Sequence, residues 1–433
     1  MKTFVEPNRG EWEALTRRPA QDLSRLEATV RAIMQRVREE GDAALRDYTA
    51  RFDGVELEDF AVSEESVSAA ADRVPEQLKQ AIQTAKRNIE TFHRSQQIEV
   101  EEIETMPGVR CWRESRAIDR VGLYIPGGTA PLFSTVLMLA VPAQIAGCQE
   151  IILCSPPNKE GDIHPAILYA ARLCGVTRIF RLGGSQAIAA MTYGTESVPG
   201  VYKLFGPGNA YVTVAKQLAQ LHGVAIDMPA GPSEVLVCAD AGAKSSHVAA
   251  DLLSQAEHGH DSQVVLVTES EQQAADIRLQ LAVQLDLLPR KELARRSLEN
   301  SMALVFNDWA EAAEYINLYA PEHLILSMAN AREFAGGIRN AGSIFLGYYT
   351  PESVGDYASG TNHTLPTYGY ARQYSGVSLD SFVKKITFQE LTAEGLRLLG
   401  PAVEIMAEAE ELMAHRNAVS LRLKNLEPQI GTD

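Results

Sequence analysis

The sequence has no apolar run long enough to cross a bilayer. The longest, "TVLMLAVPAQIAG" at 135–147, falls short of the roughly 20 residues that a spanning helix needs, and Pro142 interrupts it. The first residues, "MKTFVEPNRGEWEALTRRP", also lack the apolar centre of a secretory signal peptide. We therefore expect a soluble protein without a membrane-spanning segment.

Cysteine is scarce, and none of it stands in a metal-binding or redox spacing. The 433 residues include five cysteines, and no two form a CxxC pair. Cys154 and Cys238 fall within apolar stretches without a histidine close in sequence, which is typical of inert buried thiols. This usage indicates a reducing compartment, so we expect the protein in the cytoplasm.

The sequence has fewer basic than acidic residues. It contains 40 lysines and arginines and 56 aspartates and glutamates, which gives a formal net charge of -16. This balance argues against a nucleic-acid-binding face and suits an enzyme of small molecules. The sequence also lacks GxGxxG, a P-loop and GxSxG. The usual fingerprints for dinucleotides, nucleoside triphosphates and serine hydrolases are therefore absent.

From residue 121 onward, short apolar stretches alternate regularly with amphipathic ones. Predicted strands such as "VGLYIP", "EIILCSP" and "TRIFRLGG" alternate with helices up to residue 223, and a second series runs from "EVLVCAD" to "GSIFLG". The pattern predicts an α/β fold with two doubly wound, Rossmann-like parallel sheets. Residues 21–95 and 381–424 are predicted to be helical.

Three glycine-rich turns follow predicted strands: "IPGGTAP" at 125–131, "LGGSQA" at 182–187 and "FGPGNA" at 205–210. Any one of them is accounted for by a tight turn. Because the carboxyl ends of parallel strands share one edge of a sheet, the three together favour a nucleotide-like ligand at that edge. Backbone N–H groups and helix N-termini would hold it.

The stretch "DLLSQAEHGHDSQ" at 251–263 places polar residues on one face of a predicted helix. Gln255 and His258 lie within one helical turn of each other, and Gly259 is expected to end the helix before His260. This spacing allows joint coordination of a metal ion, and it equally allows simple solvation.

Another candidate site is the stretch "YAPEHLIL" at 319–326. Glu322 and His323 are adjacent there, just before an apolar strand. A carboxylate beside an imidazole is a natural unit for proton transfer, although Glu-His is also a common dipeptide.

Two later stretches combine carboxylates with histidine. The loop "VGDYASGTNHTLPT" at 354–367 offers Asp356 and His363 as metal ligands, and the helical "EIMAEAEELMAHRN" brings Glu410 close to His415. A solvated loop and a charged surface helix are the alternative interpretations.

Taken in order, these segments resemble the histidinol dehydrogenase family over essentially the whole chain. The resemblance is carried by "VGLYIPGGTAPLFSTVLMLAVPAQIAGC", "IFRLGGSQAIAA", "FGPGNAYVTVAK", "DMPAGPSEVLV", "DLLSQAEHG", "YAPEHL", "GDYASGTNHTLPT" and "EAEELMAHRNAV". Each segment alone is a weak signal, whereas all of them in this order are specific.

The resemblance implies zinc-dependent, NAD-linked oxidation of L-histidinol to L-histidine through L-histidinal, the last step of histidine biosynthesis. His323 would take the alcohol proton and Glu322 would activate water for the second oxidation. The family's zinc ligands correspond to Gln255, His258, Asp356 and His415, and its NAD+ contacts to Tyr124, Gln186 and Asn209. Its substrate contacts correspond to Ser233, Gln255, His258, Glu322, His323, Asp356, Glu410 and His415.

The resemblance also implies a homodimer in which the C-terminal segment completes the partner's site. We accordingly expect an N-terminal segment (1–20), a first α/β domain with the catalytic and metal residues (21–120 and 233–377), a second, NAD-contacting α/β domain (121–232) and a helical C-terminal segment (378–433). The family often has proline where this chain has His260, so His260 is expected to be a bystander next to a ligand.

Two other functions are alternatives at this stage. A related metal- and NAD-dependent alcohol dehydrogenase would act on another small polyol, such as a sulfonated propanediol. Glu410 and Glu411 suit an ammonium group better than a sulfonate, which counts against it. The other alternative is a catalytically silent binding module, against which the intact set of candidate residues speaks.

Overall fold

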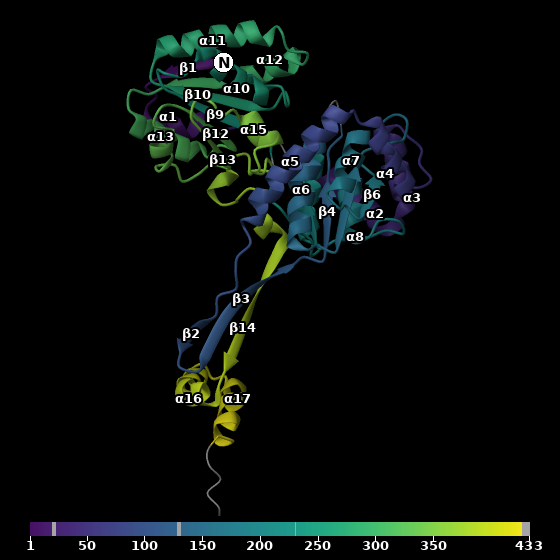
Figure 1. The fold of residues 1–433 in the computed structure, drawn as a ribbon, viewed down its shortest axis with the longest axis vertical. Helices are drawn as coiled ribbons and strands as arrows, with labels where there is room; N and C mark the ends of the chain where they lie inside the picture. Colours follow the sequence, from purple (N-terminus) through teal and green to yellow (C-terminus); the bar gives the residue numbers. More distant parts are fainter. Residues whose placement is uncertain (20–22, 128–130, 230, 427–433) are drawn as a thin grey trace, which may run out of the picture. The chain divides into compact units, whose positions relative to one another are not determined.

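The computed structural model describes residues 1–19, 23–127, 131–229 and 231–426 (Figure 1). The chain divides into two compact units: Met1–Gln96 with Ile118–Phe382, and Gln97–Ala117 with Val383–Asp433. In the described ranges, no helix is both long enough and apolar enough to cross a membrane.

The larger sheet of the first unit has six strands, all parallel, in the order β1–β11–β10–β9–β12–β13. The strands are β1 (Lys2–Val5), β9 (Glu234–Ala239), β10 (Gln263–Thr268), β11 (Met302–Val305), β12 (His323–Ser327) and β13 (Ser343–Leu346). Every residue of β9 to β12 is buried, as expected for a parallel sheet covered on both faces.

Helices cover the two faces of this sheet separately. One face packs against α10 (Ser245–Ala256), α11 (Glu271–Leu285) and α12 (Lys291–Glu299), and the other against α1 (Arg9–Leu15), α13 (Trp309–Tyr319) and α14 (Ala331–Ala335). Val235 and Val237 of β9 belong to the first core, whereas Leu236 and Cys238 belong to the second. This alternation follows from the two-residue period of a strand. The short helix α15 (Glu352–Tyr357) follows β13.

The second sheet of this unit has five parallel strands in the order β6–β5–β4–β7–β8. The strands are β4 (Arg120–Tyr124), β5 (Glu150–Ser155), β6 (Arg178–Arg181), β7 (Lys203–Phe205) and β8 (Ala225–Ile226). The helices that alternate with them are α6 (Phe133–Ala146), α7 (Pro165–Leu173), α8 (Gly184–Tyr193) and α9 (Ala210–Gln220). The two parallel sheets confirm the predicted α/β class.

The N-terminal helices pack around this five-stranded sheet, which differs from the predicted grouping of 21–120 with 233–377. They are α2 (Leu23–Glu40), α3 (Asp42–Tyr48), a π-helical turn (Thr49–Asp53), α4 (Glu64–Ala70), a 3₁₀ turn (Ala71–Arg73) and α5 (Glu76–Arg94). Val30 and Ile33 of α2 share a core with Ile188 of α8, and Ile89 of α5 shares one with Val136 of α6. An amphipathic pattern shows that a helix has a buried face, but not which sheet covers it.

The second unit is an antiparallel sheet with two helices. Its strands are β2 (Ile103–Met106), β3 (Val109–Ala117) and β14 (Val383–Leu391), and its helices are α16 (Ala393–Ala409) and α17 (Met413–Lys424). Strand β14 corrects the prediction that 378–433 is wholly helical, as does the 3₁₀ turn Leu379–Phe382. Strand formation there depends on pairing with β3, where Phe388 stacks on Trp112 at a ring distance of 5.2 Å.

Candidate active site

A large pocket lies at the carboxyl edge of the five-stranded sheet. From β4 the chain continues to β5 and β6 on one side, and then crosses to β7 on the other side, so this edge has a topological switch point. The pocket encloses about 1320 Å³, above the roughly 300–1,000 Å³ of ordinary small-ligand sites. All three predicted glycine-rich turns contribute to it, although residues 128–130 of the first lie outside the described ranges.

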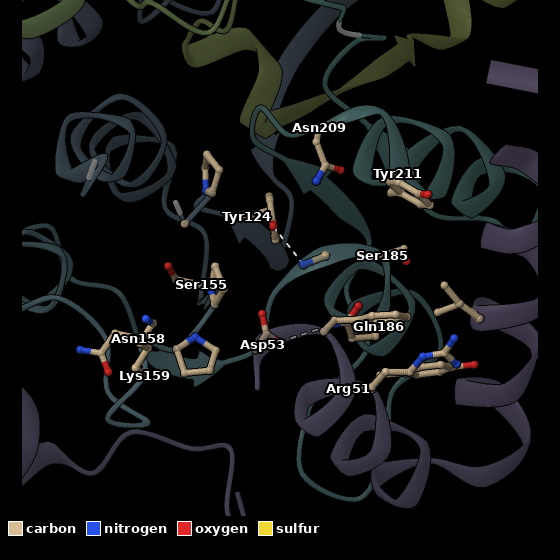
Figure 2. A pocket seen from close by; sticks show the side chains of 18 of the residues that line it. Arg51, Asp53, Tyr124, Ser155, Asn158, Lys159, Ser185, Gln186, Asn209 and Tyr211 are labelled. Atoms are coloured by element: carbon tan, nitrogen blue, oxygen red, sulfur yellow. Dashed lines mark hydrogen bonds between the residues drawn. The ribbon is translucent and has the colours of Figure 1, made fainter. Parts of the chain in front are cut away.

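The three predicted NAD+ contacts, Tyr124, Gln186 and Asn209, line this pocket together (Figure 2). Tyr124 ends β4, and its hydroxyl oxygen accepts a hydrogen bond from the backbone N–H of Gly184 at 3.0 Å. Asn209 caps α9, since its side-chain oxygen accepts from the backbone N–H of Val212 at 3.1 Å. Burial raises the pKa of Tyr124 to about 12, so its hydroxyl stays neutral at physiological pH.

Asp53 is a further pocket residue, and sequence reasoning missed it. It ends the π-helical turn after α3, and its Oδ2 accepts from the side-chain Nε2 of Gln186 at 3.5 Å (Figure 2). Burial raises the pKa of this carboxyl to about 6. In sequence, Asp53 precedes a helix-ending glycine, Gly54, which is an ordinary surface pattern and carries no signal of a pocket.

The raised pKa of Asp53 predicts a pH-dependent cost to folding. Because the folded state keeps a proton that an unfolded Asp releases near pH 3.9, stability falls as pH rises from about 4 to about 6. Replacing Asp53 with asparagine should therefore stabilise the protein at pH 8 by about 1 kcal/mol, after allowance for screening of a half-buried group. Thermal melts of both proteins at pH 4 and pH 8 measure this. A gain that does not grow with pH would contradict it.

The predicted acid/base pair lies at the amino edge of the six-stranded sheet. His323 begins β12 and Glu322 precedes it, and the two residues are only 4% and 5% exposed. Their side chains meet, with His323 Nδ1 3.6 Å from Glu322 Oε2. The start of the neighbouring strand β9 holds both: the backbone N–H of Glu234 donates to Glu322 Oε2 at 2.9 Å, and its carbonyl oxygen lies 3.2 Å from His323 Nδ1.

The electrostatic environment of this pair favours proton transfer. Burial raises the pKa of Glu322, and the neighbouring imidazole of His323 opposes part of that rise. Burial alone would lower the pKa of His323, but the carboxylates of Glu352 and Glu322 outweigh it and raise that pKa well above its usual value. Both groups consequently hold a proton more tightly than they would in water, and their contact allows a proton to pass between them.

Asp356 and Gln255 reach the same place from two different helices. Asp356 Oδ1 lies 3.5 Å from His323 Nε2, and oxygen or nitrogen atoms of His323, Glu352 and Asp356 all lie within 4.8 Å of one another. Gln255, fully buried near the end of α10, donates from its side-chain NH₂ to Glu352 Oε1. With the NH₂ placed so, the amide oxygen lies 3.2 Å from the backbone nitrogen of Glu234, whose N–H donates to Glu322 Oε2 at the shorter distance of 2.9 Å.

His258 lies just beyond the end of α10 and interacts electrostatically with Asp356. The residue as a whole is exposed, but partial burial of its ring lowers its pKa. The negative charge of Asp356 acts against this and raises the pKa. The ligand atoms that converge among the described residues are those of His323, Glu352 and Asp356, so joint metal binding by Gln255, His258 and Asp356 stays a prediction. His260 follows Gly259 in a turn and is exposed.

The cluster has the donors that a divalent metal ion requires. An amide oxygen, a carboxylate oxygen and an imidazole nitrogen are typical ligands for zinc and related cations. Among the described residues, His323 Nε2 and Glu352 Oε2 are buried side-chain atoms without a hydrogen-bond partner. Buried polar atoms left without partners are rare, and a cation in this cluster would account for them. The group of His323, Glu352 and Asp356 could therefore hold a divalent cation, such as the zinc ion that the family resemblance implies, and the identity of the ion and of its ligands stays a prediction.

His363 connects the cluster with the pocket-forming sheet. Its Nδ1 lies 2.8 Å from the carbonyl oxygen of Asp356, and its Nε2 lies 3.2 Å from Thr135 Oγ1 in the first turn of α6. Burial lowers the pKa of His363, so it is neutral at physiological pH. These contacts link Asp356 to α6, the helix that follows the glycine-rich turn at 125–131.

The predicted substrate contacts all remain predictions, including Ser233, Glu410 and His415. Ser233 directly precedes β9 and is half-buried. Glu410 and His415 belong to the second unit, where both are exposed around the tight turn between α16 and α17. Glu411 makes that turn in a left-handed conformation with φ of 59°.

Comparison with known proteins agrees with this geometry. The family model described as histidinol dehydrogenase matches residues 16–423. The histidinol dehydrogenase of Bacteroides thetaiotaomicron is 59% identical over 426 residues, which cover 98% of this chain and 100% of the relative. That of Yersinia pestis is 54% identical, covering 96% of this chain and 93% of its own.

A solved structure shows the same relationship. The crystal structure of histidinol dehydrogenase from Elizabethkingia anophelis superposes with a TM-score of 0.96 at 55% identity, covering 98% of both chains. The sequence match and the shared fold both extend over nearly the whole chain. This protein therefore belongs to the histidinol dehydrogenase family.

Proposed function

We propose that the protein oxidises L-histidinol to L-histidine through L-histidinal, with two NAD⁺ and one bound zinc ion per site. The observation that carries this proposal is the buried Glu322–His323 pair next to the donors of Gln255, His258 and Asp356. Proton-transfer groups beside a metal site, joined to a dinucleotide-sized pocket, are the parts that an NAD-linked alcohol oxidation needs.

The pocket at the five-stranded sheet would hold NAD⁺. The N-terminus of α8 at Gly184 supplies backbone N–H groups and a favourable helix dipole for a pyrophosphate. Tyr124, Gln186 and Asn209 would contact the rest of the dinucleotide from the same pocket (Figure 2). The absence of GxGxxG is compatible with this role, because several strand-to-helix turns would together contact the dinucleotide in place of one fingerprint loop.

Gln255, His258 and Asp356, with the partner's His415, would hold the zinc ion. When bound, zinc supplies a positive charge that orients the substrate's nitrogen and oxygen donors and favours the ionised alcohol. Glu410 of the turn before α17 offers a carboxylate for the substrate's ammonium group, and Ser233 offers a hydroxyl.

The residues of the pair would act in succession. In the first oxidation His323 removes the hydroxyl proton of histidinol while the carbon-bound hydrogen leaves as hydride to NAD⁺, which gives histidinal and NADH. In the second, Glu322 takes a proton from the water that adds to the aldehyde carbon. The anion RCH(OH)O⁻ formed in this way would lose a hydride to a second NAD⁺ and become the carboxylic acid of histidine, which then releases its remaining proton to solvent.

Cysteine chemistry takes no part in these steps. Burial raises the pKa of Cys154 and of Cys238, so these two thiols are protonated and unreactive. Buried, protonated thiols also support a cytoplasmic location for the enzyme.

A shared site in a homodimer is expected to show complementation between inactive variants. Glu322→Gln and His415→Asn should each form little or no histidine as pure proteins, so histidine formation is the activity measured, because every site then lacks one group needed for the complete reaction. In a refolded one-to-one mixture, half of the dimers carry both variants, and each such dimer has one site with neither defect. About a quarter of wild-type activity should return. Activity that stays at the level of the parents would contradict the shared site.

Substrate choice is tested by the NADH that forms with L-histidinol and with a sulfonated propanediol at equal concentration. We expect NADH with histidinol alone, and a loss of that signal after dialysis against a zinc chelator. Equal or greater activity with the sulfonate would reject the proposed substrate. Activity that survives complete metal removal would reject the role of zinc.

A further inference from the structure

A buried arginine from the N-terminal segment reaches the strand that holds the acid/base pair. Arg18 lies shortly after α1, and its side chain is only 7% exposed. Its guanidinium donates to both carboxylate oxygens of Glu234, from Nε to Oε2 at 2.7 Å and from Nη2 to Oε1 at 3.1 Å. Glu234 is the first residue of β9 and is itself 1% exposed. Neither side chain takes part in the two proposed oxidations, so their burial as an ion pair needs another explanation.

The main chain of Glu234 contacts both members of the acid/base pair. Its N–H donates to Glu322 Oε2 at 2.9 Å, and its carbonyl oxygen lies 3.2 Å from His323 Nδ1. Tyr319 adds a second restraint on the Glu234 side chain, since its hydroxyl donates to Oε2 at 3.2 Å. A displacement of Glu234 therefore moves the neighbours of Glu322 and His323 together.

The same guanidinium also holds the turn that leads into the pair. Nη2 of Arg18 donates to the carbonyl oxygen of Tyr319 at 2.6 Å and to that of Ala320 at 3.4 Å. The guanidinium carbon lies over the ring of Tyr319, 3.7 Å from its centroid. Ala320 has a left-handed conformation with φ of 52°, which a residue other than glycine keeps only where its surroundings hold it. Arg18 therefore supports the turn from which Glu322 and His323 follow.

A guanidinium is suited to join these two segments. Its planar fork donates two N–H groups to one carboxylate, and the second N–H of Nη2 remains for a main-chain carbonyl. The ammonium group of lysine is a point charge and cannot reproduce this arrangement. A buried ion pair usually adds little to stability compared with apolar side chains of similar volume, so we ascribe its main effect here to geometry.

We propose that Arg18 is a positioning residue for the Glu322–His323 pair and acts through Glu234. The ion pair of Arg18 with Glu234 is a clamp that ties the start of β9 to the turn after α13, so that the acid/base groups keep the geometry that proton transfer requires. This inference rests on the proposed function, in which the two groups act in succession, and extends it to residues outside the pair.

The test is Arg18→Met in the full-length, zinc-loaded protein, because methionine keeps an apolar stem and removes every donor. The rate of each oxidation is measured in a single turnover, with L-histidinol or with L-histidinal supplied directly. We expect both rates to fall about 10- to 100-fold, as for reacting groups displaced by about 1 Å. KM for NAD⁺ should stay within about twofold, since the described residues that line the proposed NAD⁺ pocket do not include Arg18. Slowing of one oxidation alone would overturn the proposal, because Glu234 contacts both groups.

Arg9→Met is the matched control. Arg9 also pairs with a carboxylate of α13, with Nη1 2.6 Å from Glu314 Oε2, but these two side chains are 59% and 53% exposed. An exposed ion pair contributes little, so both oxidations should keep their wild-type rates. An equal loss in Arg9→Met would show that any weakening of the N-terminal segment slows the reaction, and the specific role of Arg18 would be rejected.

A double variant separates positioning from stability. Arg18→Met alone leaves the carboxylate of Glu234 buried without its counter-charge, so the protein should melt at a lower temperature. Adding Glu234→Met removes that carboxylate, and the melting temperature should rise again. The clamp is still absent from the double variant, so both rates should remain as low as in Arg18→Met. Rates that recover together with the melting temperature would show that Arg18 acts through stability alone, which contradicts the proposal.

The same measurements separate this inference from the proposed function. A wild-type protein that forms no NADH with L-histidinol overturns the function itself, whereas an active wild type with unchanged rates in Arg18→Met overturns only the positioning role. Should Arg18→Met fail to fold, the double variant is compared with the wild type directly, and Arg18→Lys is added because it keeps the charge. Slower oxidations in these folded variants support the proposal, and wild-type rates reject it.

Discussion

Replacing Glu322 with glutamine is expected to slow the oxidation of L-histidinal about 10²–10⁴-fold, the usual contribution of a general base. Glutamine keeps the size of the side chain, and its oxygen still accepts from the backbone N–H of Glu234 that now donates to Glu322 Oε2 at 2.9 Å. The fold should therefore persist while the group that takes a proton from water is lost. Stopped-flow measurement of NADH, with histidinal supplied directly, gives this rate.

The first oxidation provides an internal control for this variant. Because His323 removes the alcohol proton, Glu322→Gln should still convert histidinol to histidinal and release about one NADH per turnover before it stalls. The exposed Glu314, paired with Arg9 on the surface, offers a matched substitution, Glu314→Gln, that should leave both steps unchanged. Histidinal oxidation at the wild-type rate in Glu322→Gln would show that another group activates water.

Replacing His258 with asparagine is expected to weaken zinc binding by more than about 100-fold, since changes in residues that merely support a ligand already cost about 10–100-fold. The shorter side chain of asparagine cannot bring a donor atom to the position of the imidazole nitrogen. Once zinc is lost, the carboxylates of Asp356 and its neighbours also lose the positive charge of the ion. Zinc content after gel filtration and the rate of histidinol oxidation should fall together.

His260 is the natural control for that experiment. It lies two residues further along, beyond the end of α10, and is exposed. His260→Pro should retain zinc and activity, because no contact of the cluster depends on it. The assignment would be reversed if His260→Pro lost zinc while His258→Asn kept it.

Local periodicity explains which parts of the fold could be predicted. The helices at 271–285 and 309–319 lie within the predicted second series, because the apolar spacing within each of them suffices to define it. Strand β14 could not be predicted in this way, since its pairing partner β3 lies more than 250 residues earlier in the chain. The packing of α2 to α5 on the five-stranded sheet is likewise a tertiary choice that no local pattern contains.

The residues of the candidate site likewise divide into those with a local sequence signal and those without one. Glu322 and His323 stand out because two chemically active side chains are adjacent, and Gln255 with His258 because they share one helical turn. Glu352 gave no such signal: in "TPESVG" it reads as an acidic residue in the first turn of a helix, which the helix dipole alone explains. Its place beside His323 and Asp356 becomes visible only in the folded chain.

The stoichiometry of NADH to histidine tests the central claim most directly. With L-histidinol limiting, NAD⁺ in excess and the zinc-loaded protein, both products are counted at completion. The proposed pair of oxidations at one site predicts two NADH for each histidine formed, with no histidinal left over. One NADH per histidinol consumed, with the aldehyde as the product, would contradict the four-electron reaction, and no NADH at all would contradict the activity.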